Sequence, residues 1–301
     1  MGEFWMFPGQ GYQHAGMLQN VSRSLIDKVQ SLTGIELLDT DEAYKDSIQI
    51  QLGILTLQID QVDRIKKAGI RPQIVGGHSL GVFGAAYAAE NLRCEDAIRL
   101  VYQRAKLMQN AYHSGYGMGV VVGLSRAKVE RIVAQVNSLT EPVFASNQNS
   151  AVQIALSGKI TAIQKVIELA KKNGAQTAKL IKVPVPSHSP LMKNVAKALS
   201  KDLREIQIFP SSIRYLTNYS GMVTQSIDDI RYDLGNNLIH PVYWEQMTDV
   251  ALEFSPNLIV EFSPGHAFSK LIKTKSDIRT FAIDDYGIED SLFLLKKWKR
   301  G

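Results

Sequence analysis

A short apolar stretch that runs into a serine between glycines constrains this chain more than any other feature of its sequence. Residues 74–76 read I-V-G, residues 77–81 read G-H-S-L-G, and residues 81–89 are rich in alanine. This order predicts a buried strand, a sharp turn and a helix, with Ser79 at the turn. The glycines allow the turn because they carry no Cβ atom to collide with neighbouring backbone.

The turn would place the Ser79 hydroxyl above the first turn of the helix, where free N–H groups and the helix dipole stabilise negative charge. A serine in this position attacks acyl groups and forms a covalent ester. The pattern therefore predicts acyl chemistry at Ser79, with the N–H of Leu80 donating to the oxyanion. The same five letters also occur by chance in glycine-rich turns, so the flanking strand and helix carry the argument.

Composition limits the class of protein. The 301 residues are 45% hydrophobic, which suffices for one large or two modest domains. No apolar stretch approaches the ~20 residues of a membrane span, and the N-terminus lacks the features of a signal peptide. The single cysteine, Cys94, excludes an internal disulfide framework. The net charge of +5 comes from scattered basic residues, so we expect no binding to nucleic acid. Because the sequence lacks a membrane span and signal-peptide features and has one cysteine, we expect a cytoplasmic enzyme that does not bind membranes.

The periodicity of apolar residues predicts two units. A strand at residues 4–7, helices between residues 17 and 68 and a helix at residues 95–112 belong to a larger α/β domain, as does a late strand at residues 258–262. Between them the pattern is β-α-β-β-α-β, typical of a ferredoxin-like unit. Its strands are expected at residues 118–124, 142–146, 152–157 and 178–185, and its helices at residues 125–137 and 161–173. We therefore expect residues 1–117 and 188–301 to form the large domain, and residues 118–187 a small α+β domain across a cleft.

A serine hydroxyl needs a base, and six histidines are available: His14, His78, His113, His188, His240 and His266. His188 is the best candidate, because the prolines of V-P-V-P-S-H-S-P at residues 183–190 stiffen its backbone at the junction of the two units. The alternative is an ordinary surface histidine. His78 lies beside the serine and is expected to support the turn. The histidines lack the spacing of metal ligands, so no metal is expected.

The group that would orient the base is ambiguous in the sequence. Asp233, Glu261 and Asp284 are possible carboxylates, and a backbone carbonyl could serve in their place. The second oxyanion donor should come from a glycine-rich turn at the end of a neighbouring strand. P-G-Q-G at residues 8–11 fits this description, with the N–H of Gln10 as the donor; the alternative is an ordinary turn that ends a strand.

Arg104 borders an apolar face of its predicted helix, beside Val101, Ala105 and Met108. An arginine in this position usually extends its charged end to solvent. The alternative is a fork that binds a carboxylate within the cleft and selects acyl groups that carry a free acid.

Taken together, these motifs resemble the malonyl-CoA:acyl carrier protein transacylase family over nearly the whole chain. Their joint order and spacing are more specific than any one of them. The matching motifs are F-P-G-Q-G at residues 7–11, G-H-S-L-G at 77–81, Q-R-A-K-L-M at 103–108, N-Q-N-S at 147–150, P-S-H-S-P-L-M at 186–192, P-V-Y-W at 241–244 and E-F-S-P-G at 261–265. The resemblance implies an α/β-hydrolase-like core with an inserted ferredoxin-like subdomain.

The resemblance also implies roles for individual residues. Ser79 would be the acylated nucleophile and His188 its base, with Gln10 and Leu80 forming the oxyanion hole. Arg104 would bind the free carboxylate of the malonyl group, and the main-chain carbonyl of Asn237 would orient His188. No permanently bound cofactor is implied, since malonyl-CoA is a substrate.

Within the family, the chain looks most like the transacylase subunit of malonate decarboxylase. Val82 and Phe83 follow the serine motif where the fatty-acid branch usually has Glu-Tyr, and residues 111–118 also resemble the decarboxylase branch. The expected partners are malonyl-CoA, an acidic carrier subunit with a CoA-derived arm, and other decarboxylase subunits. The alternatives are a malonyl transacylase of fatty acid or polyketide synthesis, a serine hydrolase, and a docking subunit without turnover.

Overall fold

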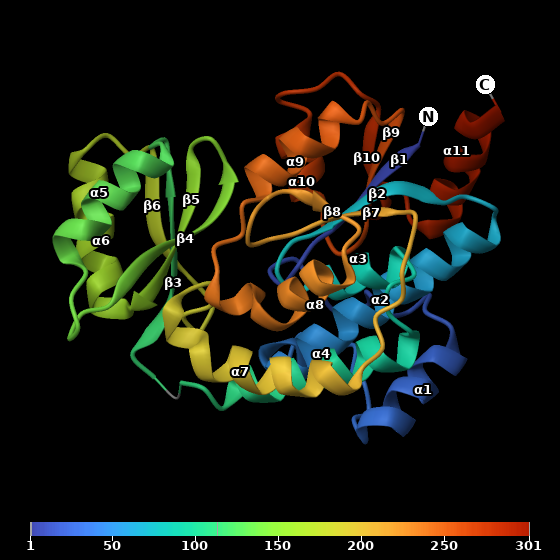
Figure 1. The fold of residues 1–301 in the computed structure, drawn as a ribbon, viewed down its shortest axis with the longest axis horizontal. Helices are drawn as coiled ribbons and strands as arrows, with labels where there is room; N and C mark the ends of the chain where they lie inside the picture. The colour runs from blue at the N-terminus through green and yellow to red at the C-terminus, as the bar shows by residue number, and fades with distance from the viewer. Residues whose placement is uncertain (1, 113, 301) are drawn as a thin grey trace.

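Two β-sheets organise the computed structural model, which describes residues 2–112 and 114–300 (Figure 1). The larger sheet has six strands in the order β10-β9-β1-β2-β7-β8, and the smaller has four in the order β4-β5-β3-β6. In Figure 1 the small sheet lies on the left with helices α5 and α6, and the large sheet lies on the right with the remaining helices. The mixed α/β fold predicted from the sequence is thus confirmed.

The large sheet is parallel except at one edge. Its strands are β1 (Glu3–Phe7), β2 (Pro72–Gly77), β7 (Arg214–Leu216), β8 (Val223–Thr224), β9 (Leu258–Glu261) and β10 (Thr280–Ala282), and only β8 pairs antiparallel with its neighbour. Residues 4–7 of β1 form a continuous apolar run, as expected of a strand that is buried on both faces of its sheet. Trp5 and Phe7 belong to the larger core cluster, whereas Phe4 and Met6 belong to a second cluster on the opposite face.

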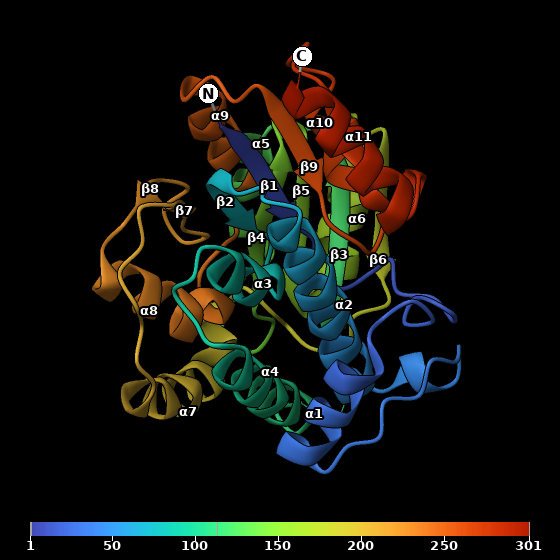
Figure 2. The same cartoon turned by 90° about the vertical axis from the view of Figure 1, so that its right-hand side faces the viewer.

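Helices α2 (Ser47–Lys67), α3 (Gly81–Ala88) and α4 (Cys94–Gln109) contribute to the larger cluster, and α9 (Trp244–Glu253) and α10 (Ala267–Ile272) to the second. Figure 2 shows α2 lying beside α3 and α4. The other helices outside the small unit are α1 (Arg23–Thr33), α7 (Lys193–Asp202), α8 (Ile227–Asn236) and α11 (Ile288–Arg300). Within the described residues, no helix combines the length and the apolar character that crossing a bilayer requires.

The small unit has the β-α-β-β-α-β order that the sequence predicted. It consists of β3 (Tyr116–Val122), α5 (Arg126–Val136), β4 (Val143–Ser150), β5 (Gln153–Lys159), α6 (Ile160–Lys172) and β6 (Thr177–Ile181). Its strands are all antiparallel, and it has a core cluster of its own that includes Val121, Val129 and Ile163. The division into domains at residues 117 and 188 stays a prediction.

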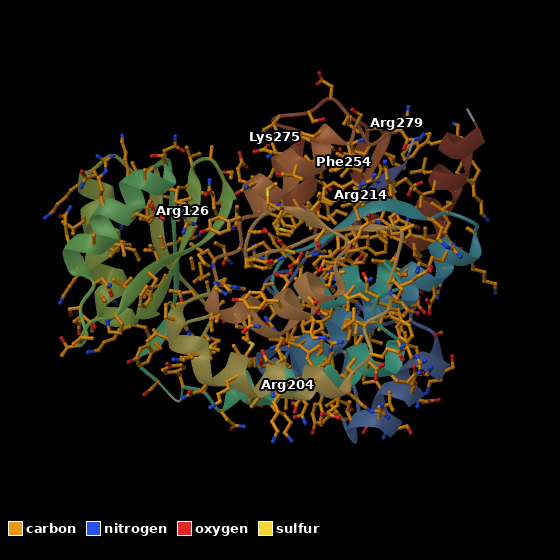
Figure 3. The ribbon with its side chains drawn as sticks, viewed as in Figure 1. Arg126, Arg204, Arg214, Phe254, Lys275 and Arg279 are labelled. Atoms are coloured by element: carbon orange, nitrogen blue, oxygen red, sulfur yellow. The ribbon has the colours of Figure 1, made fainter. Side chains whose placement is uncertain are left out.

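Side-chain and backbone contacts join the two units. Arg126, at the start of α5 (Figure 3), donates to the carbonyls of Ala145 (3.2 Å) and Ser146 (3.0 Å) within the small unit. Its guanidinium also lies 5.1 Å from the ring centre of Tyr243, which precedes α9. The N–H of Gln148 on β4 donates to the carbonyl of Val242 at 2.8 Å. These contacts hold β4 against the segment that leads into α9, so the small sheet has a fixed place beside the large one.

Some predicted boundaries were wrong. Strand β6 ends at Ile181 instead of residue 185, because Pro184 and Pro186 have no N–H to donate to a sheet. Helix α4 runs from Cys94 to Gln109, whereas the sequence predicted a helix at residues 95–112. Ser125 occupies the N-cap of α5 but forms no capping bond through its side chain.

The predicted strand, turn and helix are present around Ser79. Strand β2 ends at Gly77, α3 begins at Gly81, and Ser79 has a left-handed φ of 55° between them. A Cβ atom on Gly77 would lie 2.1 Å from the carbonyl carbon of Gly81, and one on Gly81 would lie 2.0 Å from the carbonyl oxygen of Phe7. Both distances are far inside van der Waals contact with backbone, so glycine is required at both positions.

We therefore predict that Gly77→Ala destabilises the protein severely. Overpacking typically costs about 1–3 kcal/mol, and here the clash is with backbone that cannot move aside, so we expect a loss of at least about 3 kcal/mol. Urea unfolding followed by circular dichroism measures the loss. The matched control is Gly53→Ala in α2, where the nearest atoms to a Cβ belong to side chains, the flexible end of Met17 at 3.0 Å and the ring of Tyr44 at 3.4 Å. Equal stability of the two variants would contradict the packing argument.

Candidate active site

Three residues that the sequence singled out meet at one point. The Oγ of Ser79 lies 2.8 Å from Nε2 of His188 and 3.1 Å from Nη2 of Arg104. Ser79 comes from the turn after β2, His188 from the segment after β6, and Arg104 from the middle of α4. A hydroxyl, an imidazole and a guanidinium therefore share a single hydrogen-bonded cluster.

The turn that carries Ser79 is clamped by Asn218, which sequence reasoning missed. The N–H of Ser79 donates to Oδ1 of Asn218 at 2.9 Å, and Nδ2 of Asn218 donates to the carbonyl of Gly77 at 2.6 Å. Asn218 follows β7, the parallel neighbour of β2, so both segments emerge at the same edge of the sheet. The buried carboxylate of Asp233 accepts the N–H of Asn218 at 2.9 Å and so fixes the clamp.

His188 is held so that Nε2 faces the serine. Its Nδ1 lies 2.9 Å from the carbonyl of Asn237 and 3.2 Å from that of His240, so Nδ1 carries the proton and Nε2 is free to accept one. The residue has a left-handed φ of 62° and is 2% exposed. Burial, aided by His78 and Arg104, lowers the pKa of His188 to about 3. At neutral pH the ring is uncharged, which is the form that a base requires.

The three carboxylates that the sequence offered as orienting groups do not contact His188. Asp233 supports the clamp at Asn218, and Glu261 accepts N–H groups at the start of α10. Asp284 accepts a backbone N–H from the turn after β9. Burial raises the pKa of both Asp233 and Glu261 to about 7. The sequence analysis also allowed a backbone carbonyl to orient His188, and the structure shows the carbonyls of Asn237 and His240 at its Nδ1.

The other histidines have partners elsewhere. Nε2 of His78 lies 3.0 Å from Oδ1 of Asn149 on β4, so His78 joins the serine turn to the small sheet. The remaining described histidines bind Tyr232 (His240), Asp285 (His266) and the carbonyl of Ala15 (His14), and His113 lies outside the described residues. Within the described residues, no group of three or more histidine, cysteine, aspartate or glutamate side chains is arranged to hold a metal ion.

Arg104 is a buried cation that has no carboxylate partner among the described residues. It is 1% exposed, and among the described residues its hydrogen-bond partners are Ser79 and Oε1 of Gln51, which lies 2.5 Å from Nη1. Its Nε has no hydrogen-bond partner in that part of the chain. Burial lowers the pKa of Arg104 to about 9, so it stays charged at neutral pH. A buried and unpaired charge is costly, and this one is therefore suited to bind an anion beside Ser79. Sequence reasoning missed Gln51, whose only signal was a polar residue in an apolar helix.

The two predicted oxyanion donors lie on adjacent turns. Gly9, just before Gln10, packs against the serine turn so closely that a Cβ there would be 2.8 Å from the carbonyl oxygen of His78. Leu80 is the N-cap of α3. Among the described residues no acceptor is recorded for the N–H of Gln10 or of Leu80. Their role as donors to an oxyanion stays a prediction.

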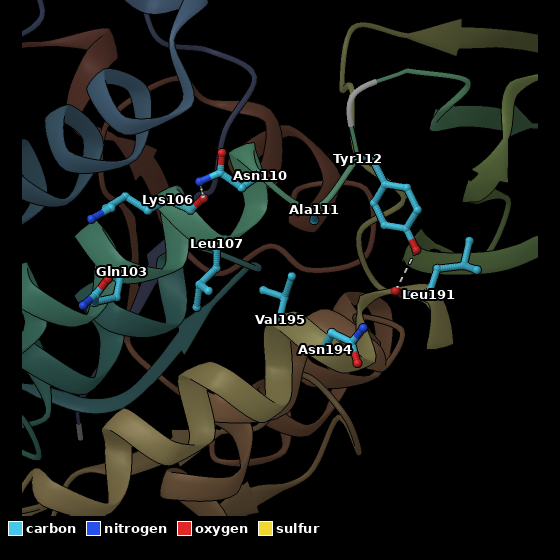
Figure 4. A pocket seen from close by; sticks show the side chains of 9 residues that line it. All are labelled: Gln103, Lys106, Leu107, Asn110, Ala111, Tyr112, Leu191, Asn194 and Val195. Carbon is cyan, nitrogen blue, oxygen red and sulfur yellow. Dashed lines mark hydrogen bonds between the residues drawn. The ribbon is translucent and has the colours of Figure 1, made fainter.

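A separate cavity of about 400 Å³ lies between α4 and the start of α7 (Figure 4). It is lined by Lys106, Leu107 and Asn110 on one side and by Leu191, Asn194 and Val195 on the other. At its end, the hydroxyl of Tyr112 donates to the carbonyl of Leu191 at 2.9 Å. This bond ties the end of α4 to the segment that carries His188. None of the three clustered residues lines this cavity.

Comparisons with known proteins agree with this geometry. A family model described as an acyl transferase domain matches residues 4–278. The malonyl CoA-acyl carrier protein transacylase of Haemophilus influenzae is 30% identical over 295 residues, covering 93% of this chain and 94% of that protein. The crystal structure of FabD from Acinetobacter baumannii has a TM-score of 0.91 and 30% identity, and covers 97% and 98% of the two chains. A malonyl-transacylase in complex with its type II PKS acyl-carrier protein has a TM-score of 0.87 and 29% identity, and covers 94% and 95%.

The buried imidazole generates a prediction about pH. We expect the ring of His188 to titrate well below the ordinary value of 6.5, assigned by NMR with the aid of His188→Asn. Burial also lowers the pKa of His78 to about 4. The unfolded chain takes up both protons near pH 6.5 and the folded protein does not, so these two histidines lower the folding stability as the pH drops from 6.5 toward 4. Asp233 and Glu261 contribute in the opposite direction, because their raised pKa values let the folded protein take up protons first. His188→Asn should therefore lose less stability than the wild-type protein over this range. Titration of His188 near 6.5 would contradict the burial that we describe.

Proposed function

The chain belongs to the acyl transferase domain family, and from this premise we propose that it moves a malonyl group from malonyl-CoA to the thiol of an acyl carrier protein. The observation that carries the proposal is the unpaired guanidinium of Arg104, 3.1 Å from the Ser79 hydroxyl. A malonyl thioester has a reacting carbonyl and, one carbon further on, a free carboxylate. The arrangement suits this pair of groups, because Arg104 would bind the carboxylate and thereby place the carbonyl next to the Ser79 hydroxyl.

In the first half-reaction, Arg104 pairs with the distal carboxylate of malonyl-CoA. Nε2 of His188 takes the proton of Ser79 as Oγ attacks the thioester carbonyl. The N–H groups of Gln10 and Leu80 donate to the oxyanion that forms. The carbon–sulfur bond then breaks, His188 gives its proton to the sulfur of CoA, and Ser79 keeps the malonyl group as an ester.

The second half-reaction is the reverse with a different thiol. The carrier thiol gives its proton to His188 and attacks the seryl ester, and the same donors hold the oxyanion. The carbon–oxygen bond breaks, and the proton returns to Ser79. His188 is 2% exposed and Arg104 1% exposed, whereas Ser79 is half-buried. Hydrolysis is the rival that shares the same serine turn, and comparing the release of free malonate with transfer to a carrier separates the two reactions.

The carrier distinguishes the two transacylases that the sequence analysis considered. The sequence analysis favoured the transacylase subunit of malonate decarboxylase. The relatives support the alternative, a malonyl transacylase of fatty acid or polyketide synthesis, since they carry the name malonyl CoA-acyl carrier protein transacylase. The malonyl-transacylase solved with its acyl-carrier protein supports the same class of partner. The assignment to malonate decarboxylase rests on Val82, Phe83 and the resemblance of residues 111–118, and it stays a hypothesis. Offering the malonylated enzyme two carriers, one with phosphopantetheine and one with the decarboxylase-type arm, tests it.

Two further expectations accompany this proposal, namely that the protein has no permanently bound cofactor and that it is cytoplasmic. The large sheet, with its nucleophile between a strand and a helix, supports the description of the core as α/β-hydrolase-like.

We predict that Arg104→Ala separates malonyl from acetyl transfer. Losing one partner of a buried charge pair costs about 3–5 kcal/mol, so kcat/KM for malonyl-CoA should fall by at least about 100-fold, and that for acetyl-CoA far less. Steady-state transfer to a carrier measures both. Arg99→Ala on the same helix is the control, since that side chain is 56% exposed. Equal losses for the two acyl groups would remove Arg104 from carboxylate binding.

A further inference from the structure

Helix α2 carries three buried glutamines into the larger core cluster. Gln51 and Gln58 are fully buried and Gln61 is 4% exposed. Burying an amide is unfavourable unless it finds hydrogen-bond partners. Gln51 contacts Arg104 in the active site, whereas Gln58 and Gln61 face the loops that follow β1 and β9. Helix α2 therefore contacts Arg104 and also the loops after β1 and β9.

Gln58 bridges two loops through a single amide nitrogen. Its Nε2 donates to the carbonyl of Pro8 at 2.9 Å and to the carbonyl of Ser263 at 3.1 Å. Its Oε1 is buried without a hydrogen-bond partner among the described residues, and a Cβ on Gly84 would lie 2.4 Å from it. A buried acceptor without a donor costs about 1–3 kcal/mol, so stability alone gives a poor account of this glutamine.

The carbonyl of Pro8, which Gln58 binds, lies two residues before the predicted oxyanion donor Gln10. Pro8 and Gly9 share one planar peptide, so a fixed carbonyl fixes the orientation of the whole unit. Gly9 in turn lies against the serine turn, with its Cβ position 2.8 Å from the carbonyl oxygen of His78 and 3.6 Å from the nitrogen of Leu80. The next N–H along the chain is that of Gln10.

We propose that Gln58 is a positioning residue for the oxyanion hole. By holding the Pro8 carbonyl, it keeps the turn at residues 8–11 against the serine turn, so that the N–H of Gln10 points at the oxyanion. Gln58 touches neither substrate nor reacting atoms. The inference rests on the proposed acyl transfer through Ser79, and it assigns to α2 a role in both halves of the site: Gln51 orients the carboxylate fork, and Gln58 the oxyanion donor.

Gln61 provides a matched control, because it lies one turn along the same helix and binds the same loop. Its Nε2 donates to Oγ of Ser263 at 2.7 Å, and the N–H of Ser263 donates to its Oε1 at 3.1 Å. No bond from Gln61 to residues 8–11 is recorded. A variant at Gln61 therefore weakens the Ser263 loop and leaves the Pro8 bond in place.

The experiment compares Gln58→Met with Gln61→Met, since methionine has a similar length and no strong donor. Single-turnover acylation of Ser79 is measured at several concentrations of malonyl-CoA and, separately, of p-nitrophenyl acetate, and rates are normalised to the titratable active sites. Losing one oxyanion donor costs about 10²–10³ in kcat, so displacing one should lower the maximal rate of Gln58→Met by roughly 10–100-fold with both reagents. The half-saturating concentration of malonyl-CoA should stay unchanged, and Gln61→Met should keep the wild-type rate.

Equal losses in the two variants, or a change in half-saturation alone, would overturn the proposal. If the wild-type protein reacts with p-nitrophenyl acetate and not with malonyl-CoA, the proposed function fails, and the ester series still decides the role of Gln58. Reaction with neither reagent overturns both.

If Gln58→Met does not fold, Gln58→Glu replaces it. Its carboxyl can donate to one carbonyl only while protonated, so acylation should decline as the pH rises and the carboxyl ionises. This decline should be absent from the wild-type protein and from Gln61→Glu. A wild-type pH profile in Gln58→Glu would count against the proposal.

Discussion

The active site depends on the close approach of two backbones, the end of β1 and the turn after β2. The N–H of His78 donates to the carbonyl of Phe7 at 2.8 Å, and Gly81 packs against the same carbonyl oxygen at a distance that excludes any side chain. This approach brings the turn at residues 8–11 beside Ser79. It also explains the strained backbone of Ser79, because Asn218 and the parallel sheet hold a conformation that a serine would not adopt unaided.

Burial also determines which groups of the active site are charged. The same removal from water that lowers the pKa of His188 leaves Arg104 charged, since an arginine begins from a much higher value. The result is a neutral base and an unpaired cation around one hydroxyl. The cation also disfavours protonation of the imidazole, which keeps the ring in the form that accepts a proton. The carboxylate of an acyl group would pair with the buried guanidinium of Arg104.

The sequence predicted the local parts of this arrangement better than the distant ones. Ser79 was identifiable because its strand, turn and helix are contiguous, and His188 because prolines flank it. Arg104 was ambiguous, since periodicity places it beside an apolar face without showing what it meets. Asn218 and Gln58 were missed because each acts across more than 45 residues of chain, and a single polar residue gives no local pattern. The end of β6 was misplaced because apolar residues alternate with prolines, which cannot pair in a sheet.

The central claim is that Ser79 carries the malonyl group between two thiols. The most direct test incubates the protein with malonyl-CoA, digests it and locates the acyl group by mass spectrometry, with Ser79→Ala in parallel. We predict one malonyl group on the peptide that contains Ser79, its absence from the variant, and its loss when a carrier thiol is added. A malonyl group on another residue, or an acyl-enzyme that persists in Ser79→Ala, would contradict the account.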